Sequence, residues 1–146
     1  MAKYRIVLAD DHTLVLQAFA KMLEGEFEVP AIFSDGRSLL KAMPALKPDA
    51  IVLDIGMPIL NGLDAGRQLK KLLPSVKLIF LTMHEDPGLA AEAIRAGASA
   101  YLLKTSAAAE LVKAIREALK GRVYITPVIA RRMEDSFIRN PVAKHA

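Results

Sequence analysis

The residues best suited to chemistry in this sequence each follow a short apolar run. They are three carboxylates, a hydroxyl and an ammonium group: Asp10, Asp11, Asp54, Thr82 and Lys104. Carboxylates that lie close together repel one another, which raises their pKa values unless a cation lies between them. A hard divalent ion such as Mg²⁺ prefers carboxylate and carbonyl oxygens, so we expect a magnesium site where the three carboxylates meet.

The other two groups suit a phosphoryl group. Lys104 supplies a positive charge and Thr82 a hydroxyl, and phosphoryl transfer depends mainly on positioning and on neutralising charge. Asp54 ends the apolar segment 51–53 and can act as the nucleophile that forms an aspartyl phosphate. Any one of these residues alone would more simply be a helix cap, a strand end or a solvated side chain. Their combination favours phosphoryl chemistry.

Five apolar segments predict the strands that carry these groups, and they cover residues 5–9, 28–33, 50–54, 76–82 and 99–103. They alternate with segments of helical spacing, which predicts an α/β fold: a doubly wound, five-stranded parallel sheet with helices on both faces. Pro30 cannot donate a sheet hydrogen bond, so the second strand should lie at an edge, in the flavodoxin-like order 2-1-3-4-5. Asp10, Asp11 and Asp54 then meet at one crevice.

The helices are predicted from apolar spacing and from capping residues. Pro44 and Pro48 are expected to end the second helix, and Leu72 is expected to lie on the apolar stripe of the third. Asp86 and Ser106 are expected to cap the fourth and fifth helices. His12 and His84, in the loops beside the acidic pair and Thr82, are expected to face solvent.

Composition excludes several classes of protein. The chain has 146 residues, of which 53% are hydrophobic and 25% charged, enough for one domain with a buried core. It has no cysteine, which excludes disulfides, thiolate zinc sites and cysteine nucleophiles. No apolar run approaches the roughly 18 residues of a membrane span, and no signal-like segment precedes the first strand. We therefore expect a cytoplasmic protein without a membrane partner.

The formal net charge of +4 is concentrated near the carboxyl terminus. Residues 122–146 contain five basic and two acidic residues, whereas residues 1–121 contain 15 basic and 14 acidic residues. We therefore expect a nearly neutral domain over residues 1–121 and a linker or helical tail over residues 122–146. In the tail, Ile129, Met133 and Phe137 have helical spacing and should need a partner surface: the same domain, a second copy of the chain, or a DNA-binding domain.

The strand ends and loops resemble one known family. The matching stretches are Leu8-Ala-Asp-Asp-His12, Leu53-Asp-Ile-Gly-Met-Pro58 with Asn61-Gly62, Leu81-Thr82, and Gly97-Ala-Ser-Ala-Tyr-Leu-Leu-Lys104. Over residues 4–121 the chain resembles the receiver domain of two-component response regulators. The Asp-Asp-His start and the continuation over residues 121–127 are most similar to receivers of the LuxR/FixJ (NarL-like) subgroup.

This resemblance implies how phosphate and metal are held. Asp54 would accept phosphate from a phosphohistidine on a sensor histidine kinase or a phosphotransfer protein. Asp11 and Asp54 would ligate Mg²⁺ together with the backbone carbonyl of Gly56, and Asp10 would act mostly through water. Gly56 departs from the family pattern because the position two residues after the acceptor, which tunes phosphate lifetime, has no side chain here.

The resemblance also implies a switch. Thr82 and Lys104 would bind the phosphoryl group, and Tyr101 matches an aromatic residue that changes rotamer. The response would be carried by the face formed by the fourth helix, fifth strand and fifth helix. Thr105 follows the lysine at a position where the family commonly has a proline after a cis peptide bond, which leaves the isomer of this bond to be established.

Function follows from the resemblance, with alternatives. It implies a phosphoacceptor that is not an enzyme and that controls transcription through a DNA-binding output domain. No helix-turn-helix follows in this chain, so a regulator cut at its linker and a stand-alone receiver acting through protein contacts both stay open, as does a homodimer. A haloacid-dehalogenase-type phosphotransferase is less favoured because it needs an aspartate where Gly56 lies. An FMN binder is disfavoured because Asp10 and Asp11 would repel its phosphate.

Overall fold

The computed structural model describes residues 3–139, with side chains described for residues 3–136. Its sheet contains β1 (Ile6–Ala9), β2 (Ile32–Phe33), β3 (Ala50–Asp54), β4 (Lys77–Thr82), β5 (Ala98–Leu103) and β6 (Tyr124–Ile125). All neighbouring strands are parallel, in the order β2-β1-β3-β4-β5-β6. The doubly wound fold and the order 2-1-3-4-5 are confirmed, whereas the expected number of five strands is too small by one.

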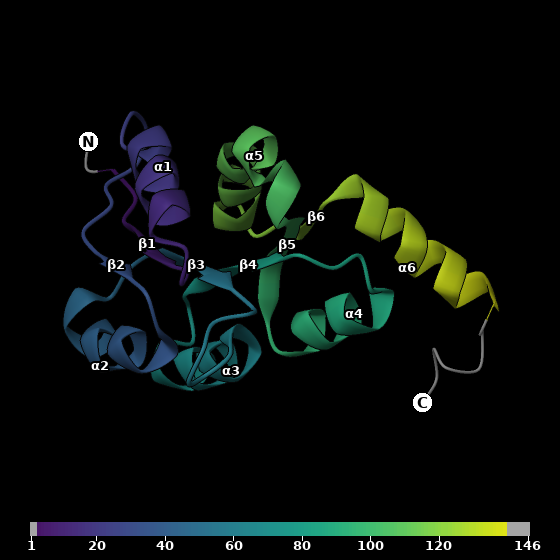
Figure 1. Cartoon of the computed structure of the whole chain (residues 1–146), viewed down its shortest axis with the longest axis horizontal. Helices are drawn as coiled ribbons and strands as arrows, with labels where there is room; N and C mark the ends of the chain where they lie inside the picture. The colour runs from purple at the N-terminus through teal and green to yellow at the C-terminus, as the bar shows by residue number, and fades with distance from the viewer. Residues whose placement is uncertain (1–2, 140–146) are drawn as a thin grey trace.

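The described residues form six α-helices around the sheet: α1 (Thr13–Leu23), α2 (Gly36–Leu46), α3 (Gly62–Leu72), α4 (Pro87–Arg95), α5 (Ala107–Leu119) and α6 (Pro127–Arg139). Figure 1 shows α1 and α5 on one face of the sheet and α2, α3 and α4 on the other, with α6 beside α4 at the β6 edge. No helix in the described part of the chain is long and apolar enough to cross a membrane.

The core consists of two apolar layers, one on each face of the sheet. Successive side chains of a strand point to opposite faces, so Val7 and Ile51 join the layer under α2, α3 and α4, whereas Leu8 and Val52 join the layer under α1 and α5. All four residues of β1 and all five of β3 are buried. These strands therefore hold their last residues in fixed positions at the carboxyl edge of the sheet.

The edge position predicted for the second strand is confirmed. Only Ile32 and Phe33 form β2, which is shorter than the predicted segment 28–33. An isolated bridge joins Arg5 to Glu28, and Pro30, which has no N–H to donate, lies between that bridge and the strand. The proline thus both places the strand at the edge and shortens it.

Two local predictions, one about α2 and one about α3, are wrong. Pro44 does not end α2, which continues to Leu46; a proline there removes one helical hydrogen bond, and Lys47 closes the helix in the left-handed region, with its N–H donating to Met43 O. Leu72 is half exposed because it lies about 180° around α3 from Leu63.

Capping was predicted correctly for α4 and incorrectly for α5. Asp86 accepts a hydrogen bond from the N–H of Gly88 at 2.8 Å, and Pro87 begins α4. Ser106 precedes α5 but its side chain makes no capping hydrogen bond. A short 3₁₀ turn over Lys104–Ser106 leads into the helix instead, and the N–H of Ala107 donates to the carbonyl of Lys104.

The segment after α5 joins the sheet and then covers α4. β6 pairs with β5, and Thr126 holds the junction: its N–H donates to Tyr101 O at 3.0 Å, and its hydroxyl accepts from Leu103 N at 2.9 Å. On α6, Ile129 is fully buried and Met133 is partly buried against the core. The surface that covers this stripe is therefore the chain's own domain. The predicted third member of the stripe, Phe137, lies outside the residues whose side chains are described.

Candidate functional site

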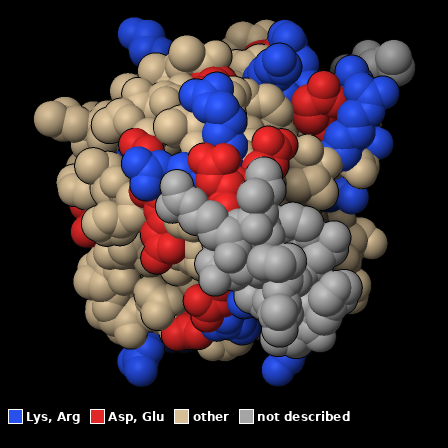
Figure 2. Space-filling model, turned by 90° about the vertical axis from the view of Figure 1, so that its right-hand side faces the viewer, with Lys and Arg blue, Asp and Glu red and all other residues tan. Residues whose placement is uncertain are grey.

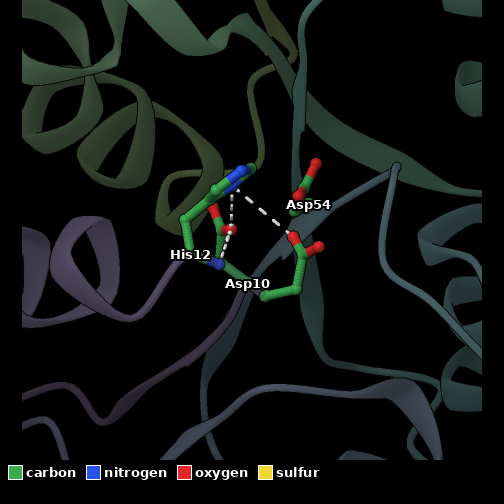
Figure 3. Close-up of side chains that lie close together, drawn as sticks. Asp10, His12 and Asp54 are labelled. Atoms are coloured by element: carbon green, nitrogen blue, oxygen red, sulfur yellow. Dashed lines mark hydrogen bonds and ion pairs between the residues drawn. The ribbon is translucent and has the colours of Figure 1, made fainter.

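The carboxyl ends of β1, β3 and β5 bring the predicted residues together. Ala9 pairs with Leu53, so the residues that follow them along the chain, Asp10 and Asp54, project from neighbouring strands at the same edge. Lys104 directly follows β5. Figure 3 shows Asp10, His12 and Asp54 gathered at this edge, with dashed lines between His12 and Asp10.

Lys104 forms ion pairs with two carboxylates. Its Nζ lies 2.8 Å from Asp10 Oδ2 and 3.3 Å from Asp54 Oδ2. The three side chains are 7%, 2% and 5% exposed respectively, so water screens these charges little. Asp10 Oδ2 also accepts no hydrogen bond with normal geometry from the described residues, although the ammonium lies beside it. The site therefore has one buried ammonium group for two buried carboxylates.

The pKa of Asp54 is raised above its ordinary value. Burial is the main cause, and repulsion from Asp10 adds to it; the N–H of Gly56, which donates to Asp54 Oδ1 at 3.0 Å, and the Lys104 ammonium oppose the shift. For Lys104, burial would lower the pKa, but the hydrogen bond to Asp10 and the two negative charges outweigh it, so its pKa is raised. Lys104 is therefore held in its charged form beside a carboxylate that is costly to ionise.

Asp11 and His12 complete the cluster on its open side. Ligand atoms from Asp10, Asp11, His12 and Asp54 all lie within 4.8 Å of one another and could hold a metal ion. His12 N donates to Asp10 Oδ1 at 2.8 Å, and His12 Nδ1 lies 2.7 Å from Lys104 Nζ. His12 was expected to face solvent, and its side chain is indeed 61% exposed. The contact of its Nδ1 with Lys104 was not expected.

Thr82 and Tyr101 belong to the neighbouring strands β4 and β5. The Thr82 hydroxyl accepts a hydrogen bond from His84 N at 3.1 Å, so it is occupied by its own loop. Tyr101 is fully buried, and its hydroxyl has no hydrogen-bond partner of normal geometry among the described residues. Burial raises the pKa of Tyr101, and the neighbouring Thr82 opposes this shift. The aromatic ring already lies inside the protein in this state.

The loop that follows Asp54 is held close by a glycine. Gly62 N donates to Ile55 O at 3.0 Å, and a β-carbon at position 62 would overlap the carbonyl oxygen of Asp54 and lie 2.8 Å from Ile55 Cα. The first residue of α3 therefore packs directly against the backbone of the central aspartate. The Lys104–Thr105 peptide bond is trans, since the described residues contain no cis bond.

The structure brings together four of the predicted residues in direct contact or within ligand distance: Asp10, Asp11, Asp54 and Lys104. Gly56 joins them through its N–H. The sequence reasoning missed the contact between His12 and Lys104, although the position of His12 directly after the acidic pair was the available signal. Chain neighbours at a strand end lie near the same site whether or not their types suggest it.

Comparison with known proteins gives consistent results. The response regulator receiver domain model matches residues 6–116. The transcriptional regulatory protein DegU of Brevibacillus brevis is 35% identical over 139 residues, which cover 94% of this chain and 59% of DegU. The crystal structure of a LuxR-family two-component response regulator from Aurantimonas sp. SI85-9A1 has a TM-score of 0.89 at 31% identity, covering 94% of this chain and 99% of that one.

A further solved structure extends the likeness. The RcsB response regulator of Salmonella typhimurium, described for its conformational dynamism in DNA interaction, has a TM-score of 0.85 at 27% identity, covering 92% of this chain and 68% of RcsB. These relatives are named as regulators and not as enzymes, in agreement with expectation. The chain belongs to the response regulator receiver domain family, among the phosphoacceptor receivers of LuxR-type (NarL-like) regulators.

Proposed function

We propose that Asp54 is the phosphoacceptor of this receiver and that Lys104 and Thr82 bind the transferred phosphoryl group. A carboxylate oxygen of Asp54 attacks the phosphorus of a phosphohistidine, the new O–P bond forms, and the P–N bond breaks, with its electron pair returning to the donor imidazole. The observation that carries this proposal is the nearly buried Asp54 carboxylate, 3.3 Å from an ammonium group at the carboxyl edge of the sheet.

The acidic cluster fits the divalent ion that this reaction uses. We assign Asp11 and Asp54 as carboxylate ligands of Mg²⁺, with the backbone carbonyl of Gly56 as a third ligand and Asp10 acting through water. The fit rests on the surplus of buried negative charge and on the Asp10 oxygen that lacks a hydrogen bond. When bound, the ion would neutralise charge on the carboxylates and on the phosphoryl oxygens.

A change at Thr82 would carry the signal away from Asp54. To donate to a phosphoryl oxygen, the Thr82 hydroxyl must turn away from His84 O, to which it donates at 3.4 Å. The unpaired Tyr101 hydroxyl lies beside Thr82 and is the group whose surroundings then change. Because Tyr101 is already buried, we expect its hydroxyl contacts to change, and not that the ring enters from outside. The face formed by α4, β5 and α5 would transmit this change.

The partners are proposed from the relatives. We propose that residues 1–121 form the receiver, that residues 122–146 form its linker, and that a sensor histidine kinase or phosphotransfer protein in the cytoplasm donates the phosphate. Control of transcription would require a DNA-binding output domain, with a homodimer as the assembly. Direct DNA binding by the face that carries α6 is not favoured, because acidic and basic side chains are interspersed on its visible part in Figure 2 and Arg132 pairs with Glu85 at 2.9 Å.

Phosphorylation by a small phosphodonor with Mg²⁺ tests the assignment. We expect one phosphoryl group per chain, located at Asp54 by intact mass and peptide mapping, and its loss in Asp54→Asn. Asp135→Asn, which changes an exposed carboxylate on α6, is the matched control and should be modified like the wild type. Modification of Asp54→Asn, or modification after all metal is chelated, would refute the proposal.

A further inference from the structure

We propose that the His12 imidazole is itself a ligand in the cation site and makes the site prefer transition ions such as Co²⁺ or Ni²⁺ over Mg²⁺. The inference rests on the proposed function, because it assumes that the carboxylate cluster binds a divalent ion. It adds a nitrogen ligand to a set made otherwise of oxygens. The position of the ring, the ring nitrogen that faces the cluster and the distances between the candidate ligands support this role.

The local backbone turns His12 toward the carboxylates. His12 is the residue before α1, with extended backbone angles, and its side chain makes no capping hydrogen bond to the helix. Its N–H donates to Asp10 Oδ1 at 2.8 Å, which folds the chain back over that carboxylate. The ring is therefore free of a helix-capping role while its Nδ1 lies inside the cluster.

The distances show which ring nitrogen faces the cluster. His12 Nδ1 lies 3.1 Å from Asp10 Oδ1 and 2.7 Å from Lys104 Nζ, so this nitrogen points toward the carboxylates. Neutral imidazole with a free lone pair is the form of histidine that ligates metals. The cluster therefore presents a nitrogen donor ready for a cation.

Lys104 marks the place where a cation is already stabilised. Its ammonium lies 2.7 Å from His12 Nδ1, 2.8 Å from Asp10 Oδ2 and 3.3 Å from Asp54 Oδ2. The Asp10 oxygen, on a residue that is 2% exposed, lacks a hydrogen bond of normal geometry from any described residue. A divalent ion held by Asp11, Asp54 and His12 would add positive charge beside this oxygen, which a water on the ion could then satisfy, and Lys104 would stay available for the phosphoryl group.

The distances suit one coordination shell. Ligands at about 2.1 Å from an octahedral ion lie about 3.0 Å apart when adjacent and about 4.2 Å apart when opposite. His12 Nδ1 lies 3.5 Å from Asp11 Oδ1, the oxygen of a proposed ligand, which is between these two spacings. An imidazole ligand adds little to the binding affinity for Mg²⁺, whereas the affinity for nitrogen ligands rises from Mn²⁺ through Co²⁺ to Ni²⁺. His12 therefore acts on metal selectivity more than on metal binding as such.

Calorimetric titration of the full chain with Mg²⁺ and with Co²⁺ tests this. For His12→Ala we expect the ratio of Co²⁺ to Mg²⁺ affinity to fall at least about 10-fold, the lower end of the loss when a group supporting a metal ligand is removed. Mg²⁺ affinity should stay within about 3-fold, since Mg²⁺ gains little from an imidazole. His12→Gln keeps an acceptor for Lys104 but no nitrogen donor, and should behave like His12→Ala. His84→Ala removes another exposed histidine at the same edge and should leave the ratio unchanged.

A spectroscopic measurement gives a second readout. Paramagnetic Co²⁺ should shift or broaden the His12 ring signals far more than those of His84. An unchanged ratio in His12→Ala, or equal losses for both ions, would mean that His12 only positions Lys104 and would overturn the inference while leaving the magnesium site intact. Absence of binding by either ion to the wild type would overturn the proposed cation site itself.

Discussion

Two consecutive residues at the end of β5 belong to regions that differ in how their buried polar and charged groups are paired. Lys104 belongs to the charged cluster, where one ammonium serves two buried carboxylates and a carboxylate oxygen lacks a hydrogen bond. Leu103 belongs to the seam with β6 and α6, where Thr126 pairs both its N–H and its hydroxyl and Ile129 is fully buried. The cluster retains uncompensated charge, whereas Thr126, which joins β6 to β5, has both its N–H and its hydroxyl hydrogen-bonded.

The difference separates reactivity from stability. Buried charge without full compensation costs free energy of folding, and proteins keep it where a ligand or a reaction will compensate it later. Apolar burial with satisfied hydrogen bonds supplies free energy without any chemistry. We therefore expect substitutions in the seam to lower stability and to spare phosphorylation, and substitutions in the cluster to do the reverse.

The largest expected effect on stability is at Ile129. Ile129→Ala removes a fully buried side chain through which α6 packs on the core, and should lower the free energy of unfolding by about 3 kcal/mol. Urea denaturation measures this loss in the free energy of unfolding. Val123→Ala, at a position 59% exposed, is the control and should change stability by less than about 0.5 kcal/mol. Equal effects at the two positions would mean that α6 does not stabilise the domain.

A smaller effect is expected at Thr126. Thr126→Val keeps the shape of the side chain but leaves the N–H of Leu103 without its acceptor, which should cost about 1–2 kcal/mol. Asp54 should still be phosphorylated. Thr105→Val, which changes an exposed threonine, provides the comparison. A drop in phosphorylation out of proportion to the loss of stability would show that the seam and the cluster are coupled and not separate.

The smallest effect has the opposite sign. Asp54→Asn removes the carboxylate whose pKa burial raises, and should increase the free energy of unfolding at neutral pH, by an amount that the compensating charge of Lys104 limits. The native state holds the Asp54 proton more tightly than the unfolded state. The contribution of Asp54 to the stability of the wild-type protein is therefore present at acid pH and is lost as the pH rises through the raised pKa. The gain in Asp54→Asn should accordingly vanish in acid; a gain independent of pH would point to another cause.

The sequence predicted the cluster better than the seam for a physical reason. A buried parallel strand has a continuous apolar run, so the polar residue that ends it stands out, as Asp54 does after residues 51–53. Pro30 likewise marked the edge strand through its missing donor. The strand β6 has only two residues, too few for any periodic pattern, and its pairing depends on Thr126, whose hydroxyl partner lies 23 residues away in the chain.

The local errors share a cause with the missed strand. Pro44 is tolerated in α2 because only one hydrogen bond is lost near the end of the helix, a cost that the packing of Met43 and Leu39 outweighs. Ser106 was expected to cap α5, but the 3₁₀ turn already supplies an acceptor, Lys104 O, for the N–H of Ala107, the first residue of the helix. In each case a tertiary or backbone alternative overrode a correct local preference.

The close approach of Gly62 to the backbone of Asp54 has a consequence for mutational tolerance. Position 62 has no functional group, yet every other residue would place a β-carbon against the Asp54 carbonyl and the Ile55 backbone. Selection of functional variants from a library at this position should return glycine almost alone, with a profile as narrow as the one expected at Asp54. A position can thus be intolerant because of the volume it must leave empty, and a search for reactive side chains alone would never find it.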